Sequence, residues 1–218
     1  MKQVQTRRFL LGGVAVMAIA AALSGCAAAI VGGAVAGGMV ATDRRTAAAQ
    51  LEDENIELRA VNNLTATFGE RAHLNVTSYN AVVLLTGEVP TAQDKLLAEQ
   101  IVSRVANVRS IVNDLAVMPN TTMTQRSTDS LITGQVKASM VDTSDLFANS
   151  FKVVTERGVV YLMGRVTQRE ADRATEIARS VSGVKRVVRV LEIVSEAELQ
   201  KAPPPAPAPA ASSAAPKT

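Results

Sequence analysis

The chain repeats one pattern, and this repeat limits it to a fold that can be built from two copies of a short unit. The first copy contains an apolar strand with a central glycine, Val82–Val89, and the second contains its counterpart, Val159–Val166. In both copies, apolar residues at helical spacing follow, and then a further β-branched run. A helical stretch and a strand precede the glycine strand, so each copy reads helix–strand–strand–helix–strand. We therefore predict an α+β fold of two small modules in tandem.

Local signals indicate where these elements begin and turn. Thr167 and Glu170 have the spacing of a capping box, which predicts the start of a helix. Arg157-Gly158 separates two β-branched runs and predicts a tight hairpin. Asn80-Ala81 takes the same place in the first copy, where the asparagine tolerates the left-handed backbone region.

Composition divides the chain into modules and flanking segments. The tail has too few large apolar residues to offset the ordering of the chain, so we predict that it is disordered. Modules of this size have marginal cores, and the single cysteine forms no intramolecular disulfide, so we expect the two modules to pack on each other. In chain order we predict a leader at 1–25, a tether at 26–50, a first module at 51–118, a linker at 119–127, a second module at 128–194 and a Pro/Ala-rich tail at 195–218.

The first 26 residues have the form of a lipoprotein signal. Arg7 and Arg8 precede an apolar run that ends in Leu23-Ser24-Gly25-Cys26. Cleavage before Cys26 would leave its thiol to carry lipid, so Cys26 is the predicted lipidation site and the chain is predicted to lie on a membrane of a bacterial envelope. The alternatives are an ordinary signal peptide with a chance cysteine and an uncleaved membrane segment over 9–40.

The charge balance argues against a nucleic-acid partner. The formal net charge is +3, but the leader contributes three basic residues and no acidic one, which leaves 20 basic residues against 20 acidic residues. Only 3% of the residues are aromatic. The chain therefore has neither the basic footprint nor the stacking side chains that nucleic-acid binding requires.

The reactive side chains predict neither an enzyme nor a metal or cofactor site. His73 is the only histidine, and its place beside a strand indicates an exposed or hydrogen-bonded residue. The sequence shows no Ser/His/Asp set and no His/Cys cluster at metal-ligand spacing. We therefore expect no catalytic residue, no metal and no cofactor.

The first helix of the second module has one more apolar row than its core needs. A surface helix buries one such row, so the second row predicts a partner, either a lipid surface or the first module. At 100° per residue, the core row is Ile132, Val136, Ser139 and Met140, and the second row is Leu131, Gly134, Ala138 and Val141, bounded by Gln135 on one side and by Thr133 and Lys137 on the other.

The corresponding helix of the first module has a different pattern. Its acidic start suits a helix N-terminus but would repel an anionic headgroup. The apolar residues form a single row, Ile56, Ala60, Val61, Leu64 and Phe68, and the acids are Glu52, Asp53, Glu54 and Glu57. If one of the two helices lies in lipid, we expect it to be the helix of the second module.

The repeat resembles the BON domain, a small helix–sheet module of bacterial envelope proteins. Gly87-Glu88-Val89, Gly164-Arg165-Val166 and the segment 180–187 carry the resemblance. Two such modules behind a lipoprotein signal are similar to a family of outer-membrane lipoproteins associated with cell division and envelope stress. The similarity extends from Cys26 to about Val194 and excludes the tail.

This resemblance implies a non-enzymatic lipoprotein on the periplasmic face of the outer membrane. It also implies enrichment at the division site and links to the barrel-assembly machinery and to regulators of peptidoglycan amidases. The family binds anionic phospholipid through the first helix of the second module, where members carry an aromatic residue in place of Leu131, which implies weaker binding here. The implied phospholipid-binding residues are Leu131, Gly134, Gln135, Lys137, Ala138 and Val141.

A different class of function is also compatible with the second apolar row. An envelope scaffold or adaptor would use the same exposed row to bind a protein partner, without specific recognition of lipid. Binding to vesicles in the absence of any partner separates the two functions.

Overall fold

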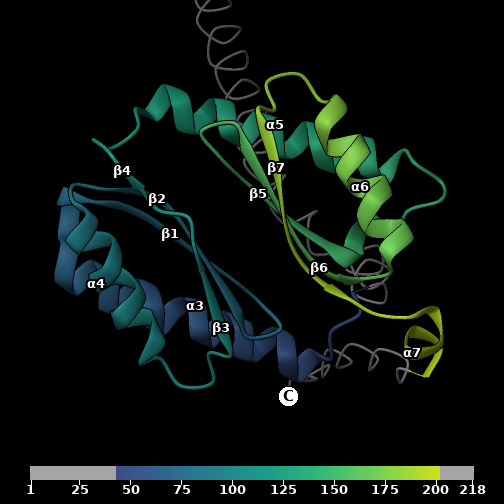
Figure 1. The fold of residues 1–218 in the computed structure, drawn as a ribbon, viewed down its shortest axis with the longest axis horizontal. Helices are drawn as coiled ribbons and strands as arrows, with labels where there is room; N and C mark the ends of the chain where they lie inside the picture. Colours follow the sequence, from purple (N-terminus) through teal and green to yellow (C-terminus); the bar gives the residue numbers. More distant parts are fainter. Residues whose placement is uncertain (1–42, 202–218) are drawn as a thin grey trace, which may run out of the picture. The chain divides into compact units, whose positions relative to one another are not determined.

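The computed structural model describes residues 43–201 (Figure 1). The predicted leader, the lipidation site Cys26, the tether up to residue 42 and the tail from 202 onward lie outside the described residues. The first module consists of α3 (Ala47–Phe68), η2 (Gly69–Arg71), β1 (His73–Tyr79), β2 (Val82–Val89), α4 (Ala92–Ser103), β3 (Ser110–Asn113) and β4 (Ala116–Val117). The second consists of α5 (Met123–Val141), η3 (Ala148–Ser150), β5 (Phe151–Glu156), β6 (Val159–Val166), α6 (Gln168–Ser180) and β7 (Arg186–Ile193), and α7 (Glu196–Lys201) follows it.

Both modules have the predicted order of helix, two strands, helix and strand, so the α+β prediction is confirmed. In the first module β1 pairs antiparallel with β2, and β3 and β4 pair parallel with β2. In the second module β5 pairs antiparallel with β6, and β7 pairs parallel with β6 along its whole length. Two short strands, β3 and β4, therefore take the place in the first module that the single strand β7 has in the second.

The two sheets lie face to face, with one pair of helices on the outer side of each (Figure 1). Alternate residues of the central strands point in opposite directions: Val83 and Leu85 of β2 pack under α3 and α4, whereas Leu84 packs toward the other sheet. In β6, Tyr161 and Met163 point toward the first sheet and meet Leu84 in one buried cluster between the two sheets. A strand that is buried on both faces has a nearly continuous run of apolar residues, and this explains why the repeated segments Val82–Val89 and Val159–Val166 are mostly apolar. The expected packing of the modules on each other is confirmed.

The glycine of each repeated strand is required by a close approach of the backbone. Gly87 has φ of +112°, and a Cβ atom there would clash with the carbonyl oxygen of His73 on β1. A Cβ atom on Gly164 would meet the carbonyl oxygen of Ser150 in the same way, although its backbone is ordinary. Both positions therefore exclude a side chain so that the neighbouring strand can pair.

The predicted hairpins are confirmed, and each is held by a buried carboxylate of the first helix of its module. Asn80 and Ala81 have φ of 51° and 63°, and the carboxylate of Asp53 accepts hydrogen bonds from both of their amides at 2.8 Å. Asp129 likewise accepts from the amides of Arg157 and Gly158 at 2.8 Å. The carboxylates join helix to hairpin in both modules.

Three boundaries differ from the sequence prediction. The helices α3 and α5 begin at Ala47 and Met123, before the predicted module starts at 51 and 128, because the side chains of Thr46 and Thr122 cap them. Residues 123–127 of the predicted linker are therefore helical. The start of the predicted disordered tail is helical as well, because Ser195 and Glu198 form reciprocal hydrogen bonds at the start of α7.

Within residues 43–201 every helix is too short or too polar to cross a bilayer.

Candidate functional site

The helix α5 presents its two apolar rows to different surroundings. Ile132, Val136 and Met140 are buried in the core of the second module. Leu131 and Val141, at the ends of the second row, are each 68% exposed. All six residues of the predicted lipid-binding face are exposed: Leu131, Gly134, Gln135, Lys137, Ala138 and Val141.

The position of α5 explains this exposure. The helix lies on the outer side of the second sheet, whereas the first module packs against the inner side (Figure 1). The second apolar row thus does not pack against the first module, which was the alternative to a lipid surface. The row is accessible from outside the described chain.

The exposed row is longer than the sequence indicated. Met123 is exposed and lies 18 residues before Val141, which is five full turns of a helix, so the two side chains share one face. Phe147, in the segment that follows α5, is a large exposed aromatic side chain. The sequence pattern predicts the apolar row only from Leu131 onward, because residues 119–127 are predicted to form a linker. Met123 therefore lies outside the predicted row.

Within α5 itself no exposed residue is acidic, whereas Asp142, which caps the helix directly after Val141, is exposed. Asp129 is the only acidic residue of the helix, and it is buried and bonded to the hairpin amides. Lys137 is exposed at the border of the apolar row. The part of the face around Lys137 therefore attracts an anionic partner more than a cationic one.

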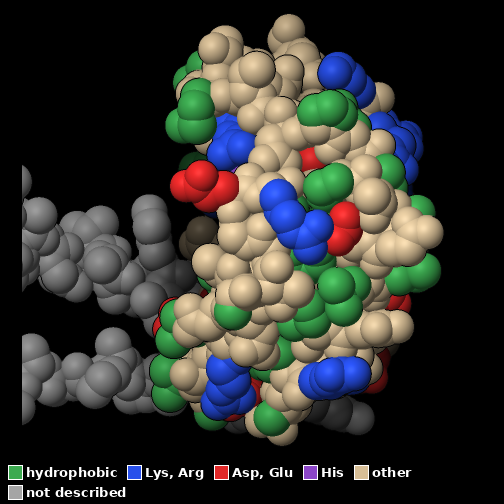
Figure 2. All heavy atoms as spheres, turned by 90° about the vertical axis from the view of Figure 1, so that its left-hand side faces the viewer, with side chains coloured by type: hydrophobic (Ala, Val, Ile, Leu, Met, Phe, Trp, Pro, Cys, Tyr) green, Lys and Arg blue, Asp and Glu red, His purple; other side chains and the backbone are tan. Residues whose placement is uncertain are grey.

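The first module also exposes apolar side chains, which corrects the prediction of a single buried row. Leu51 and Leu58 of α3 are each 60% exposed, and Val61, assigned to the buried row, is exposed. On the face that Figure 2 shows, hydrophobic side chains likewise form small groups among basic, acidic and neutral ones. Exposure of apolar residues therefore does not distinguish α5 from α3, but charge does, because Glu54 of α3 is exposed.

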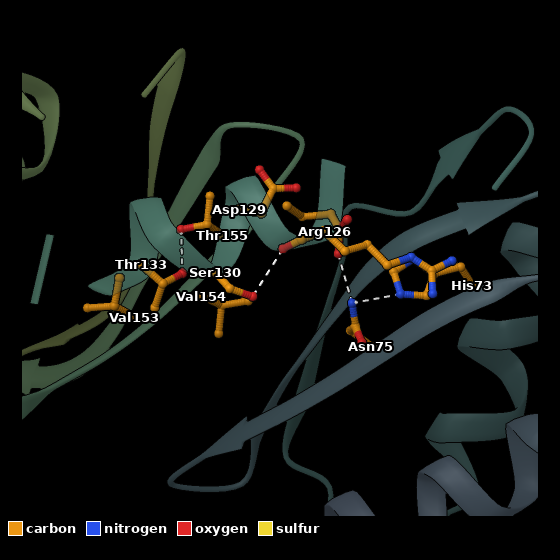
Figure 3. Close-up of a pocket in the computed structure, with 10 residues that line it drawn as sticks. His73, Asn75, Arg126, Asp129, Ser130, Thr133, Val153, Val154 and Thr155 are labelled. Atoms are coloured by element: carbon orange, nitrogen blue, oxygen red, sulfur yellow. Dashed lines mark hydrogen bonds between the residues drawn. The ribbon is translucent and has the colours of Figure 1, made fainter. Parts of the chain in front are cut away.

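A second group of chemically reactive side chains lies where the two modules meet. His73 and Asn75 of β1 face residues of α5 and β5 across a pocket of about 350 Å³ (Figure 3). His73 Nδ1 lies 3.0 Å from Glu88 Oε2, and Asn75 donates a hydrogen bond to Glu156 Oε2 at 2.8 Å. The prediction that His73 is exposed or hydrogen-bonded is confirmed, because His73 is hydrogen-bonded. The sequence did not indicate that Glu88 and Glu156 lie close to it.

The two carboxyl groups of this cluster have opposite pKa shifts. Burial raises the pKa of Glu88, but hydrogen bonds from Thr121, Arg157 and His73 stabilise the carboxylate more, so its pKa lies below the ordinary value. Burial and the charge of Glu88 raise the pKa of Glu156 above its ordinary value, despite the hydrogen bond from Asn75. The negative charge of Glu156 is therefore less well stabilised by its neighbours than the negative charge of Glu88.

The residues that lead into α3 are bound to both modules. Arg44 donates two hydrogen bonds of 2.7 Å to the carboxylate of Glu170 on α6, and a third to the carbonyl oxygen of Arg165. Arg45 pairs with Asp53 and stacks on Tyr79 at 4.2 Å from the ring centroid. The chain therefore enters the first module through a contact with the second.

Acid should weaken this entry contact. Burial raises the pKa of Glu170, but the hydrogen bonds from Arg44 and Thr167 lower it by more, so the folded-state pKa lies below the ordinary value. A carboxyl group with a lowered pKa stabilises the fold above its unfolded pKa of about 4.3, and this contribution is lost as the pH falls through the folded value. We expect the free energy of unfolding, measured with urea for residues 43–218, to fall below about pH 5, and to fall less steeply in Glu170→Gln. Identical slopes for both proteins would contradict the assignment.

Comparisons with known proteins agree with the repeated fold. A family model described as the BON domain matches residues 52–119 and 128–195. The outer membrane lipoprotein DolP of Haemophilus influenzae is 39% identical over 172 residues, which are 78% of this chain and 89% of that protein. The 21 kDa hemolysin of Actinobacillus pleuropneumoniae is 36% identical over 154 residues, or 70% of this chain and 79% of the relative.

A solved structure of CdsD, a structural protein of the type III secretion system of Chlamydia trachomatis, was also found. It covers 66% of this chain and 95% of its own chain at 13% identity, with a TM-score of 0.29. That likeness is too low to carry an argument.

Proposed function

Because the chain belongs to the BON-domain family, with two modules in tandem, we propose that it is an outer-membrane lipoprotein whose second module binds anionic phospholipid through α5. The similarity to an outer membrane lipoprotein over most of both chains supports the membrane assignment. The observation that carries the lipid assignment is the exposed row of α5, which combines apolar side chains with a lysine at its border and has no exposed carboxylate before the C-cap residue Asp142.

Lipid at Cys26 would supply the anchor in this proposal. Each buried methylene of an acyl chain contributes about 0.8 kcal/mol, and more than one chain is needed for stable attachment. Such an anchor holds the protein on the membrane whatever the modules do. The modules would then select where on the periplasmic face the protein gathers, with the division site as the proposed region and support of envelope integrity as the outcome.

The chemistry of α5 fits the boundary between headgroups and acyl chains. Leu131 and Val141 would contribute about 1.5 kcal/mol or more each on full burial in the acyl region. Lys137 beside them would add about 1 kcal/mol near an anionic surface. Gly134 and Ala138 lie between them on the same face, and their small size keeps the helix backbone close to the lipid.

Substitution of Leu131 and Val141 together by Glu should reduce binding to anionic vesicles by tenfold or more. The change removes two apolar contacts and adds two charges of the same sign as the headgroups, and about 1.4 kcal/mol corresponds to a tenfold change. Co-sedimentation of residues 43–218, which lack Cys26, with phosphatidylglycerol-containing and phosphatidylcholine vesicles measures this effect.

The matched control is the double substitution of Leu51 and Leu58 by Glu. These residues are exposed to a similar extent on α3 of the first module, so the change in hydrophobicity and charge is the same. The control should bind vesicles within about twofold of the wild type, since surface substitutions also change stability by only about 0.5 kcal/mol. Equal losses for both pairs, or unchanged binding of the α5 pair, would contradict a lipid site on α5. The same two double variants, expressed as fluorescent fusion proteins, extend the comparison to cells. Only the variant with Glu at positions 131 and 141 should lose enrichment at the division site.

A scaffold is the second candidate function, and the first module provides the observation that favours it. Leu51 and Leu58 of α3 and Leu96 of α4 are all largely exposed, outside the face proposed for lipid. A protein partner such as the barrel-assembly machinery or a regulator of peptidoglycan amidases would cover such side chains. If purified protein binds neither type of vesicle, the scaffold becomes the better proposal.

A further inference from the structure

We propose that His73, Glu88 and Glu156 form a binding site for a divalent transition-metal ion, with Zn²⁺ as the best fit, between the two modules. One ligand atom from each of the three side chains lies within 4.8 Å of the other two. Two of the side chains come from the first module and the third from the second. The site goes beyond the proposed lipid binding and does not depend on it.

The fold presents the three ligands from rigid strands. His73 and Glu88 are directly opposite each other in the antiparallel pair of β1 and β2, so their side chains share one face. Glu156 is the last residue of β5, immediately before a hairpin that Asp129 holds in place. The backbone that carries the ligands is therefore fixed, and an ion would compete mainly with the two hydrogen bonds that Thr121 donates to Glu88 Oε2 at 3.0 Å.

Zinc binds imidazole nitrogen and carboxylate oxygen at about 2.0–2.2 Å, so two ligands of one tetrahedral ion lie about 3.3–3.6 Å apart. His73 Nδ1 and Glu88 Oε2 are 3.0 Å apart in a hydrogen bond, and an ion that replaced this bond would need the two atoms to separate by only a few tenths of an ångström. The pocket lined by His73 and Glu156 has a volume of about 350 Å³, which leaves room for a water molecule as the fourth ligand. Imidazole with carboxylates favours zinc over magnesium, which prefers oxygen ligands.

The charges around the cluster leave one negative charge without a counter-ion. Glu88 pairs with Arg157 at 2.9 Å. Glu156 is only 3% exposed, and across residues 43–201 no ion pair reaches it; its contact is the neutral amide of Asn75. Arg126, which lines the same pocket, contacts Thr121 and Met123 instead. A bound cation would balance the charge of Glu156.

The second copy of the repeat provides an internal comparison. Ser150 and Arg165 stand where the first copy has His73 and Glu88, fourteen residues before the motif glycine and directly after it. Serine with arginine cannot hold a divalent cation. The site is therefore a property of the first module that Glu156 of the second completes, and a bound ion would join the two modules.

Titration of the metal-free full chain in detergent with ZnCl₂ tests the proposal. Calorimetry should give one site per chain, and Co²⁺ in place of Zn²⁺ should give the visible absorption of a four-coordinate ion. In Glu156→Gln the affinity for Zn²⁺ should fall at least tenfold, and the increase of Tm on addition of Zn²⁺ should disappear. Glu176→Gln, a change at an exposed glutamate of α6, is the matched control and should bind like the wild type.

The variant is expected to fold, because the glutamine side-chain oxygen can still accept the hydrogen bond from Asn75. A second variant, His73→Asn, removes a ligand from the other module and should lose the cobalt absorption while keeping the far-ultraviolet circular dichroism of the wild type. Saturable Zn²⁺ binding that persists in both variants, or no binding by the wild type, would overturn the proposal. MgCl₂ should produce no shift in Tm in any of these proteins.

Discussion

Replacing Gly87 with alanine should lower the free energy of unfolding by at least about 3 kcal/mol, one of the two largest effects that we expect. Its φ of +112° is a region that side chains avoid, and the added Cβ atom would meet the carbonyl oxygen of His73. Backbone strain and overpacking each cost about 1–3 kcal/mol. The strand β1 cannot retreat without losing its seven-residue pairing with β2. Urea denaturation followed by circular dichroism measures the change.

Two other glycines are controls for this effect. Gly164→Ala has the steric conflict without the unusual backbone, so we expect a smaller loss of about 1–3 kcal/mol. Gly134→Ala, on the exposed face of α5, meets no atom within 4 Å and should stabilise the helix by up to about 1 kcal/mol. If all three substitutions had the same effect, close strand approach would not be the reason for the glycine motif.

Replacing Asp53 with alanine should cost about 4 kcal/mol, because it removes the carboxylate that holds the β1–β2 hairpin. Burial raises the pKa of Asp53, but hydrogen bonds from Ser78, Ala81 and Asn80 lower it by more, so the folded-state pKa lies below the ordinary value. Each buried donor left without a partner costs about 1–3 kcal/mol. Urea denaturation gives the total, and faster hydrogen exchange at the amides of Asn80 and Ala81 should locate the damage.

Asp129→Ala is the matched substitution in the second module. Asp129 accepts from two hairpin amides and, at 3.4 Å, from the side chain of Gln125, whereas Asp53 accepts from two hairpin amides and from the side chains of Ser78 and Arg45 at 2.6 and 2.8 Å. We therefore expect a smaller loss, of about 2–3 kcal/mol. A loss below about 1 kcal/mol in both variants would show that water replaces the carboxylates at no great cost.

The order of elements was predictable because its signals are local. The capping box of Thr167 and Glu170, the hairpin at Arg157-Gly158 and the buried row of α5 each depend on residues a few positions apart. The capped starts of α3 and α5 were missed because their first turns lie in stretches that composition assigned to a tether and a linker. The same holds for α7, which begins in the tail.

The parts that could not be predicted depend on contacts between distant residues. Asp53 was interpreted as one of several acids at a helix N-terminus, but three of its hydrogen-bond donors, Ser78, Asn80 and Ala81, are 25 to 28 residues away. The cluster of His73, Glu88 and Glu156 spans both modules, and no spacing in the sequence indicates it. The exposure of the predicted α5 face agrees with a docking role, and phospholipid binding itself stays a prediction.

The bidentate contact between Arg44 and Glu170 has a mechanical consequence. Tension that arrives along the chain from its N-terminal side reaches α6 through Arg44 before it reaches α3. Sixteen residues lie between Cys26 and Asp43, and this segment spans at most about 60 Å when fully extended. A chain held at Cys26 would therefore move both modules together, and the orientation of α5 relative to the point of attachment would depend on the contacts that Arg44 makes with Glu170 and Arg165 and that Arg45 makes with Asp53.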